Sequence, residues 1–198
     1  KLKNGDVKKM KNIEINDVLE DGSYVTAKFK LSATGVNMYK YKNIIVSGSH
    51  KVLVNGMQNK IENLKNAVYI NDYRKQYIYC LNTSNKQIKI NDDIFCDWDE
   101  INSNLLDKIK NKLGDKLSPL FNQNNIHNVL EGGFDKSTEL ELLDGRSKNI
   151  DEIEVGHVLK NGDRVWGVVE ISTKDISVNK YYLENTCIIS APNNQICD

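Results

Sequence analysis

The segment LKNGDVKKMKNIEINDVLEDGSYVTAKFKLS (residues 2–32) decides the fold, because it recurs without gaps as LLDGRSKNIDEIEVGHVLKNGDRVWGVVEIS at residues 142–172. The offset between the two copies is 140 residues throughout. Internal repetition of this kind indicates one structural unit that the chain builds twice. The identical pairs are Leu2/Leu142, Gly5/Gly145, Lys8/Lys148, Ile13/Ile153, Glu14/Glu154, Val18/Val158, Leu19/Leu159, Gly22/Gly162, Val25/Val165 and Ser32/Ser172.

Turn-forming dipeptides occur at equivalent positions of both copies. Asn4-Gly5 and Asp21-Gly22 in the first copy correspond to Asp144-Gly145 and Asn161-Gly162 in the second. Such dipeptides predict hairpin turns in which both central residues have positive φ. In the stretches that follow, SYVTAKFKLS and DRVWGVVEIS, apolar and polar residues alternate well enough to predict strands. Short strands separated by turns every ~10 residues predict a mainly β fold.

The similarity resumes after each block with a three-residue shift. YKYKNIIVSGSHK (39–51) then faces YLENTCIISAPNN (182–194), so that Ser47 faces Ser190 and His50 faces Asn193. The second copy thus keeps the strand but not the histidine. Further along the first copy, IYCLNTSNKQIKINDDIFCDW (78–98) predicts strands around a turn at Ser84-Asn85 and another turn at Asn91-Asp92.

A helical pattern separates the two copies. Leu105, Leu106, Ile109 and Leu113 fall on one helical face, and Gly114 suits a helix end. We therefore predict a first copy at residues 1–98, a helical linker at 99–131 and the N-terminal part of a second copy at 132–198. Lys1 falls in the middle of an expected strand, so we expect a fragment of a longer polypeptide, whose first copy lacks its N-terminal strand.

Composition narrows the function classes. The 198 residues contain 27 Lys and Arg against 27 Asp and Glu. Zero net charge argues against a nucleic-acid partner, since binding to phosphates requires a basic excess. No stretch approaches the roughly 18 apolar residues of a membrane helix, so we expect no membrane partner. The four cysteines match no zinc pattern and are too sparse for a disulfide scaffold, which predicts an intracellular, reducing compartment and no metal or other cofactor.

The repeated unit resembles the Hedgehog/intein (Hint) family. That family's pattern K-x-I-x-x-I-x-x-G-D-x-V is similar to KKMKNIEINDVL (8–19), which keeps Asp17, and to KNIDEIEVGHVL (148–159), where His157 stands instead. The family's second block, T-x-x-H, is similar to SGSH (47–50), with Ser47 in place of threonine. Tandem copies joined by GGF also resemble Hint-like proteins of large DNA viruses. The resemblance implies a β-horseshoe fold and, for the localisation, either the cell interior or the virion.

The resemblance also implies a self-processing reaction. A Cys or Ser at the family's first position attacks the preceding carbonyl, and the histidine, here His50, protonates the scissile amide while Ser47 and Asp17 assist. An amide needs a nucleophile, a proton donor and carbonyl stabilisation together. In the second copy the nucleophile position is Gly133, which is non-catalytic. In the first copy it falls upstream of Lys1, and the splicing family's terminal His-Asn has its nearest counterpart in Cys96-Asp97.

Two function classes therefore stay open. The chain is either a catalytically degenerate Hint-fold module with a structural or interaction role, or a self-cleaving enzyme that performs an N-to-S or N-to-O acyl shift upstream of residue 1. The degenerate module is favoured because the second copy lacks both the nucleophile, with Gly133 in its place, and the histidine, with Asn193 in its place. Its partners would be the flanking segments of its own polypeptide or other structural proteins. For His50 the alternative role is a hydrogen bond from the end of a strand to nearby backbone, and for Asp17 it is the capping of backbone N–H groups.

Overall fold

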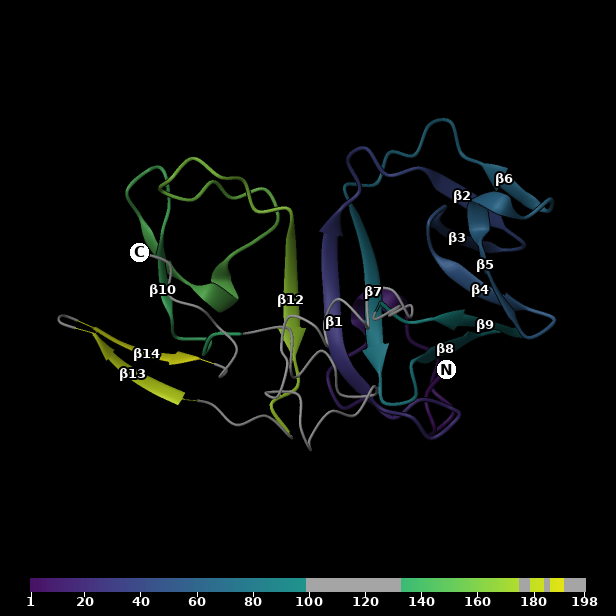
Figure 1. Cartoon of the computed structure of the whole chain (residues 1–198), viewed down its shortest axis with the longest axis horizontal. Helices are drawn as coiled ribbons and strands as arrows, with labels where there is room; N and C mark the ends of the chain where they lie inside the picture. Colours follow the sequence, from purple (N-terminus) through teal and green to yellow (C-terminus); the bar gives the residue numbers. More distant parts are fainter. Residues whose placement is uncertain (99–132, 175–178, 184–185, 191–198) are drawn as a thin grey trace, which may run out of the picture. The chain divides into compact units, whose positions relative to one another are not determined.

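The computed structural model describes residues 1–98, 133–174, 179–183 and 186–190 (Figure 1). These residues form a mainly β structure of antiparallel strand pairs, which confirms that the fold is mainly β. Their only helical elements are three short 3-10 helices, η1 (Met10–Asn12), η2 (Ile61–Asn63) and η5 (Ile150–Glu152). The predicted helical linker at 99–131 lies outside the described residues.

The chain divides into two compact units. The first comprises Lys1–Trp98 together with Trp166–Glu170, and the second comprises Asp99–Val165 and Ile171–Asp198. A short stretch of the second sequence copy therefore belongs to the first unit. It supplies most of strand β12 (Gly167–Ile171), which joins β1 (Val25–Ser32) and β7 (Tyr77–Thr83) in a sheet of order β12-β1-β7.

The first unit contains two further sheets, one of order β3-β2-β6 and one of order β5-β4-β9-β8 (Figure 1). In the second sheet β4 meets β9 at the single pair Val52↔Phe95. The strands predicted around Ser84-Asn85 and Asn91-Asp92 are confirmed as β7, β8 and β9. The strand bounds are β2 Met38–Tyr41, β3 Ile44–Ser47, β4 Lys51–Val54, β5 Met57–Lys60, β6 Ala67–Tyr69, β8 Gln87–Ile90 and β9 Asp93–Cys96.

Apolar side chains from all of these sheets form the core of the first unit. Val25, Val52, Ile61 and Phe95 are almost completely buried. The Tyr41 ring meets the Phe95 ring edge-on, with 6.4 Å between their centroids, and so joins β2 to β9. Burial of an apolar side chain of this size stabilises a fold by about 1.5–3 kcal/mol. Packing of this kind fixes β4 and β9, the two strands that position His50.

The backbone of the second copy repeats that of the first at the same offset of 140 residues. The isolated bridges Leu2↔Leu19 and Val18↔Tyr24 recur as Leu142↔Leu159 and Val158↔Arg164. Helix η1 recurs as η5, and the hydrogen bond from Val25 N to Asp17 O (3.0 Å) recurs from Val165 N to His157 O (2.9 Å). The two segments therefore have the same local backbone structure. In the second unit the strand bounds are β10 Glu139–Glu141, β11 Ser147–Asn149, β13 Asn179–Leu183 and β14 Thr186–Ser190.

The glycine turns occur where they were predicted, but their type is different. At the first turn Gly5 N donates to Leu2 O (3.0 Å) and Leu2 N donates to Asp6 O (2.8 Å), so the loop has three residues. Gly5 has a φ of 93°, whereas Asn4 is not among the residues with positive φ. A three-residue hairpin loop requires the left-handed conformation only at its last residue. The residue before the glycine instead accepts a hydrogen bond from the N–H two positions on, as Asn4 Oδ1 does from Asp6 N.

One surface ion pair is conserved between the copies with its charges exchanged. Lys1 Nζ lies 2.7 Å from a Glu20 carboxylate oxygen in the first copy. At the equivalent positions of the second copy, Lys160 Nζ lies 2.6 Å from a Glu141 carboxylate oxygen. The acid and the base have changed places while the contact remains. This exchange supports the alignment of the two copies independently of their identical residues.

The hairpin after the repeated block corrects the predicted alignment by one residue. The pair Tyr41↔Ile44 flanks the turn of the β2–β3 hairpin, and Leu183↔Thr186 flanks that of the β13–β14 hairpin. Equivalent residues are thus 142 positions apart, so the predicted three-residue shift is wrong here and the shift is two. Asn193, the residue expected to face His50, lies outside the described residues.

Candidate functional site

His50 stands directly before β4 with its ring against the end of β9. Its Nε2 lies 2.9 Å from the carbonyl oxygen of Cys96, and its ring centroid lies 5.9 Å from that of Phe95. A carbonyl oxygen can only accept, so Nε2 carries the hydrogen in this contact. The His50 backbone is also fixed, because its N donates to Ser47 O (3.1 Å) and its O accepts from Ile61 N (2.9 Å).

The position of His50 follows from the meeting of β4 and β9. These strands pair only at Val52↔Phe95, and His50 precedes Val52 by two residues. Cys96 is the last residue of β9. The imidazole therefore supplies a strand-to-strand hydrogen bond where the backbone pairing has ended. This contact matches the hydrogen bond from a strand end to nearby backbone that was one of the two predicted roles of His50.

The peptide that follows Cys96 is held on its other side by β7. The Asp97 carboxylate is 2% exposed and accepts from Thr83 N at 3.0 Å. The Trp98 N–H is shared between Asn82 Oδ1 (3.1 Å) and Leu81 O (3.3 Å). The Cys96–Asp97 peptide bond is thus fixed between an imidazole and a strand edge. Sequence reasoning had not singled out Asn82 and Thr83, although polar residues at the end of an apolar strand were a usable signal.

Two buried polar atoms near this segment lack a hydrogen-bond partner among the described residues. They are Oγ1 of Thr26, which is 8% exposed, and Nδ2 of Asn82, which is 0% exposed. Thr26 lies at the register shift between Val25↔Thr83 and Ala27↔Asn82, where β1 bulges against β7. A buried polar group without a partner costs about 1–3 kcal/mol. Such groups are few in native structures.

Ser47 contributes to this arrangement through its backbone rather than its hydroxyl. Its carbonyl accepts from His50 N, and β3 ends at this residue. Within the described part of the chain no hydrogen bond joins the Ser47 hydroxyl to His50. The glycine between them is required by space, since a Cβ on Gly48 would lie 2.5 Å from Cε2 of Tyr39. The motif SGSH thus combines a backbone turn, a close approach at Gly48 and one side chain, that of His50, which bonds to the end of β9.

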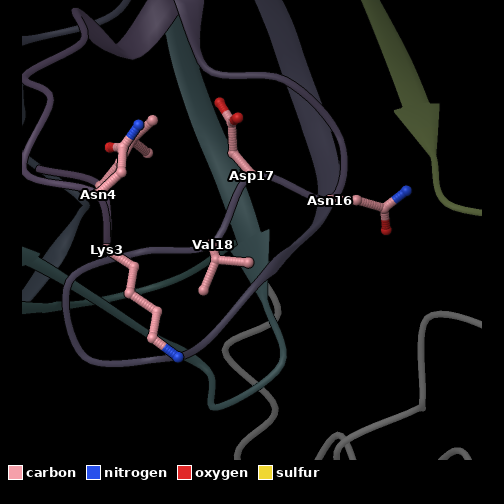
Figure 2. A pocket seen from close by; sticks show the side chains of 6 residues that line it. Lys3, Asn4, Asn16, Asp17 and Val18 are labelled. Carbon is pink, nitrogen blue, oxygen red and sulfur yellow. The ribbon is translucent and has the colours of Figure 1, made fainter.

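Asp17 lines a pocket together with Leu2, Lys3, Asn4, Asn16 and Val18 (Figure 2). Neither His50 nor Ser47 is among the lining residues. The Asp17 carboxylate receives Lys8 Nζ at 2.7 and 3.0 Å and the backbone N of Glu14 at 2.9 Å. In Figure 2 this carboxylate and the Lys3 side chain extend in opposite directions.

The ionisation of Asp17 reflects these contacts. Partial burial raises the pKa of the Asp17 carboxyl, but the hydrogen bonds from Lys8 and Glu14 and the charges of Lys8 and Lys28 lower it by more. Its pKa therefore lies below the usual value. A carboxylate stabilised in this way is a poor proton acceptor, so Asp17 fits the predicted capping role better than a catalytic one.

His157 takes the place of Asp17 in the second copy. Its Nδ1 accepts from the backbone N of Glu154 at 3.0 Å, just as Asp17 accepts from Glu14. Nδ1 must be unprotonated in this contact, which places any ring hydrogen of the neutral form on Nε2. The exchange of aspartate for histidine between the two copies therefore preserves the local hydrogen bond.

Gly133, which the resemblance places at the nucleophile position of the second copy, is half-buried. A Cβ built there would meet no atom within 4 Å, so the glycine is not required by space. It nevertheless supplies no hydroxyl or thiol. The predicted absence of a nucleophile in this copy follows from the residue itself.

Other kinds of site were sought in the same residues. The described residues contain no group of three or more His, Cys, Asp or Glu side chains placed to hold a metal ion. The side chains of Cys80 and Cys96 are buried. Among the described residues, none of the helices has the length and apolar character needed to span a membrane.

The predicted site residues therefore form two separate groups of contacts, one around His50 and Cys96 and the other around Asp17 and Lys8. No protein-family model, no curated protein sequence and no solved structure matches this chain.

Proposed function

We propose that this chain is a Hint-like β module of a larger protein, built from two copies of one unit, with a structural or interaction role and no self-cleaving activity. The observation that carries this proposal is that two of the candidate catalytic side chains, those of His50 and Asp17, have structural partners. His50 is bound to the Cys96 carbonyl, and Asp17 is bound to Lys8 and Glu14. Such contacts are those of side chains that hold strands and turns together.

The repeated local backbone supports the Hint-like part of the proposal. Two copies in one order, with recurrent bridges and turns, are what a tandem duplication of a β unit produces. The second copy supports the absence of self-cleaving activity, because Gly133 has no hydroxyl or thiol that could act as a nucleophile. A module of this kind would serve within a viral assembly or a large multidomain protein, in contact with the flanking segments of its own polypeptide.

Intact-mass measurement tests the silent module. The chain would be expressed with the residues that naturally precede Lys1, both as wild type and as His50→Ala. We expect a single uncut mass for both proteins over days at neutral pH, with and without an added small thiol. Cleavage of the wild type upstream of residue 1 that is lost in His50→Ala would overturn the proposal.

The second candidate is an acyl shift at that upstream junction, assisted by His50. Its support is that His50 carries an Nε2–H that donates to a peptide carbonyl, here that of Cys96 rather than one upstream of residue 1. A donor in this position can stabilise negative charge on an oxygen during attack. The mass experiment distinguishes the two candidates directly.

A further inference from the structure

We propose that the edge of β1 that faces away from β7 is a strand-docking surface, which selects the second-copy strand β12 and rejects a second β1, and that Glu170 and Gly167 determine this choice. The proposal rests on the interaction role proposed above and names its partner, a β-strand with the second-copy sequence. Two observations carry it: the register of β1 against β12, and the residues at which these equivalent strands differ.

β1 and β12 pair in opposite directions. Ser32 N, at the end of β1, donates at 2.8 Å to the carbonyl oxygen of Trp166, just before β12 begins. Lys28 Nζ, nearer the start of β1, lies 3.5 Å from a Glu170 carboxylate oxygen. The two strands are therefore antiparallel. Such pairing occupies backbone N–H and C=O groups that an open sheet edge would offer to any other strand.

The pairing joins equivalent parts of the two copies. At the offset of 140 residues Glu170 is the equivalent of Lys30, so its contact with Lys28 is centred on position 29 of the repeated unit. The contact of Ser32 with Trp166 has the same centre. Two equivalent strands that pair about one position have the arrangement of a twofold interface between identical subunits. Selection of the mixed pair therefore requires features that a pair of first-copy strands lacks.

Charge is the first of these features. In the mixed pair Lys28 Nζ lies 2.6 Å from a Glu14 carboxylate oxygen and 3.5 Å from one of Glu170. A second β1 in the same register would place Lys30 at the Glu170 position, and the twofold arrangement would repeat this lysine pair. Like charges on opposed residues of neighbouring strands are destabilising, and lysines on an edge strand oppose association between edges.

Space is the second feature. A Cβ on Gly167 would lie 2.5 Å from Cδ2 of Leu31 and 3.6 Å from the carbonyl oxygen of Lys30. The first copy has Ala27 at the equivalent position. A second β1 would therefore press a methyl group against the Leu31 side chain. A glycine within a strand often marks the close approach of another backbone, and Gly167 allows it here.

Amide hydrogen exchange of the full-length chain tests the selection. The double variant Gly167→Ala with Glu170→Lys gives β12 the two first-copy residues. The N–H of Ser32, which donates to the Trp166 carbonyl, should then exchange roughly tenfold faster or more, because overpacking and like charge favour local opening. Exchange at Ser32 that stays at the wild-type rate would overturn the proposal.

Two controls belong to this measurement. The N–H of Ala33 donates at 2.9 Å to the carbonyl oxygen of Gln76, just before β7, so its exchange in the double variant should match the wild type. Glu139→Lys makes the same change of charge on an exposed residue of β10. It should leave exchange at Ser32 unchanged.

Each feature has its own rescue. Leu31→Ala should return slow Ser32 exchange to Gly167→Ala, because it removes the methyl groups that the new Cβ would meet. Glu170→Gln should stay closer to the wild type than Glu170→Lys, because it adds no like charge. High salt should slow Ser32 exchange in Glu170→Lys by screening the two lysines. Failure of both rescues would overturn the assignment of Glu170 and Gly167.

Fluorescently labelled peptides test the selection in trans. A peptide of residues 163–171 should bind to the double variant, whose own strand has left the edge of β1, and its fluorescence anisotropy should rise. A peptide of the equivalent residues 23–31 should not bind. Size-exclusion chromatography should show no dimer of the variant that the wild type lacks. Equal binding of the two peptides, or such a dimer, would overturn the proposal.

A measurement on the wild type requires no variant to fold. The methyl protons of Leu31 and the Hα protons of Gly167 should give a nuclear Overhauser effect, and its absence would overturn the proposal. None of these experiments measures cleavage. Self-cleavage of the wild type would refute the silent module without changing exchange at Ser32, so the two failures are distinguishable.

Discussion

Asp17 and His157 occupy equivalent positions of the two copies, and each accepts a hydrogen bond from the backbone N–H three residues before it. The distances are 2.9 Å from Glu14 N and 3.0 Å from Glu154 N. A carboxylate and an imidazole thus perform one structural task at one place in the fold. The difference between them is that only Asp17 also binds a lysine side chain, that of Lys8.

Removal of the Asp17 side chain should destabilise the first unit by about 1 kcal/mol, the typical value for a lost capping side chain. Asp17→Asn keeps an acceptor for Glu14 N but loses the charge that faces Lys8, so it should cost less than Asp17→Ala. Urea unfolding at neutral pH measures both. Equal losses for the two variants would show that the Lys8 ion pair, rather than the backbone contact, carries the stability.

The Asp17 contribution should disappear in acid. Because its pKa is lower in the folded chain, ionised Asp17 stabilises the fold at pH values above the pKa of an unfolded aspartate, about 3.9. The stabilisation is lost as the pH falls through the lower folded pKa. The difference in unfolding free energy between wild type and Asp17→Ala should therefore shrink toward zero in strong acid. A difference that is constant with pH would contradict the assigned contacts.

His157→Ala should free the backbone N–H of Glu154. Without the imidazole no Nδ1 is present to accept from Glu154 N. Amide hydrogen exchange at Glu154 should therefore accelerate, while exchange at Glu14 in the first copy stays slow. His157→Asp supplies the acceptor that the first copy uses, so it should keep exchange at Glu154 slow. Equal exchange rates at Glu154 in wild type and His157→Ala would contradict the assigned contact.

Gly48→Ala should destabilise the first unit by about 1–3 kcal/mol, the usual cost of overpacking. Its Cβ would lie 2.5 Å from Cε2 of Tyr39 and 3.2 Å from Cβ of Glu62. Gly133→Ala is the matched control, because its Cβ would meet nothing within 4 Å. Thermal unfolding should separate the two variants clearly. A Gly48→Ala protein as stable as the control would mean that the Tyr39 ring moves aside freely.

The repeat made much of the local structure predictable. Turn glycines and β-branched alternation depend on neighbours within about ten residues, so the turn positions and β1 could be read from 2–32. The contact of His50 with Cys96 could not, because it joins residues 46 positions apart and depends on how β4 meets β9. Turn type was also missed, since Asn4-Gly5 suits a two-residue or a three-residue loop and only the pairing of Leu2 with Asp6 decides between them.

Asn82→Asp should reverse the pH dependence that Asp17 produces. Asn82 is 0% exposed, and its Oδ1 accepts from Trp98 N next to the nearly buried Asp97. An aspartate there would be buried near a second carboxylate, which raises its folded pKa above the unfolded value. The loss of stability caused by this buried carboxylate is then absent below the pKa of aspartate in the unfolded chain. It grows as the pH rises through the pKa of the residue in the folded chain. The urea midpoint of Asn82→Asp should be lower than that of Asn82→Ala at neutral pH. In acid it should move closer to the midpoint of the wild type. If the urea midpoints of Asn82→Asp and wild type instead changed in parallel with pH, solvent would reach residue 82. Solvent would then also reach the Cys96–Asp97 peptide, whose carbonyl His50 binds.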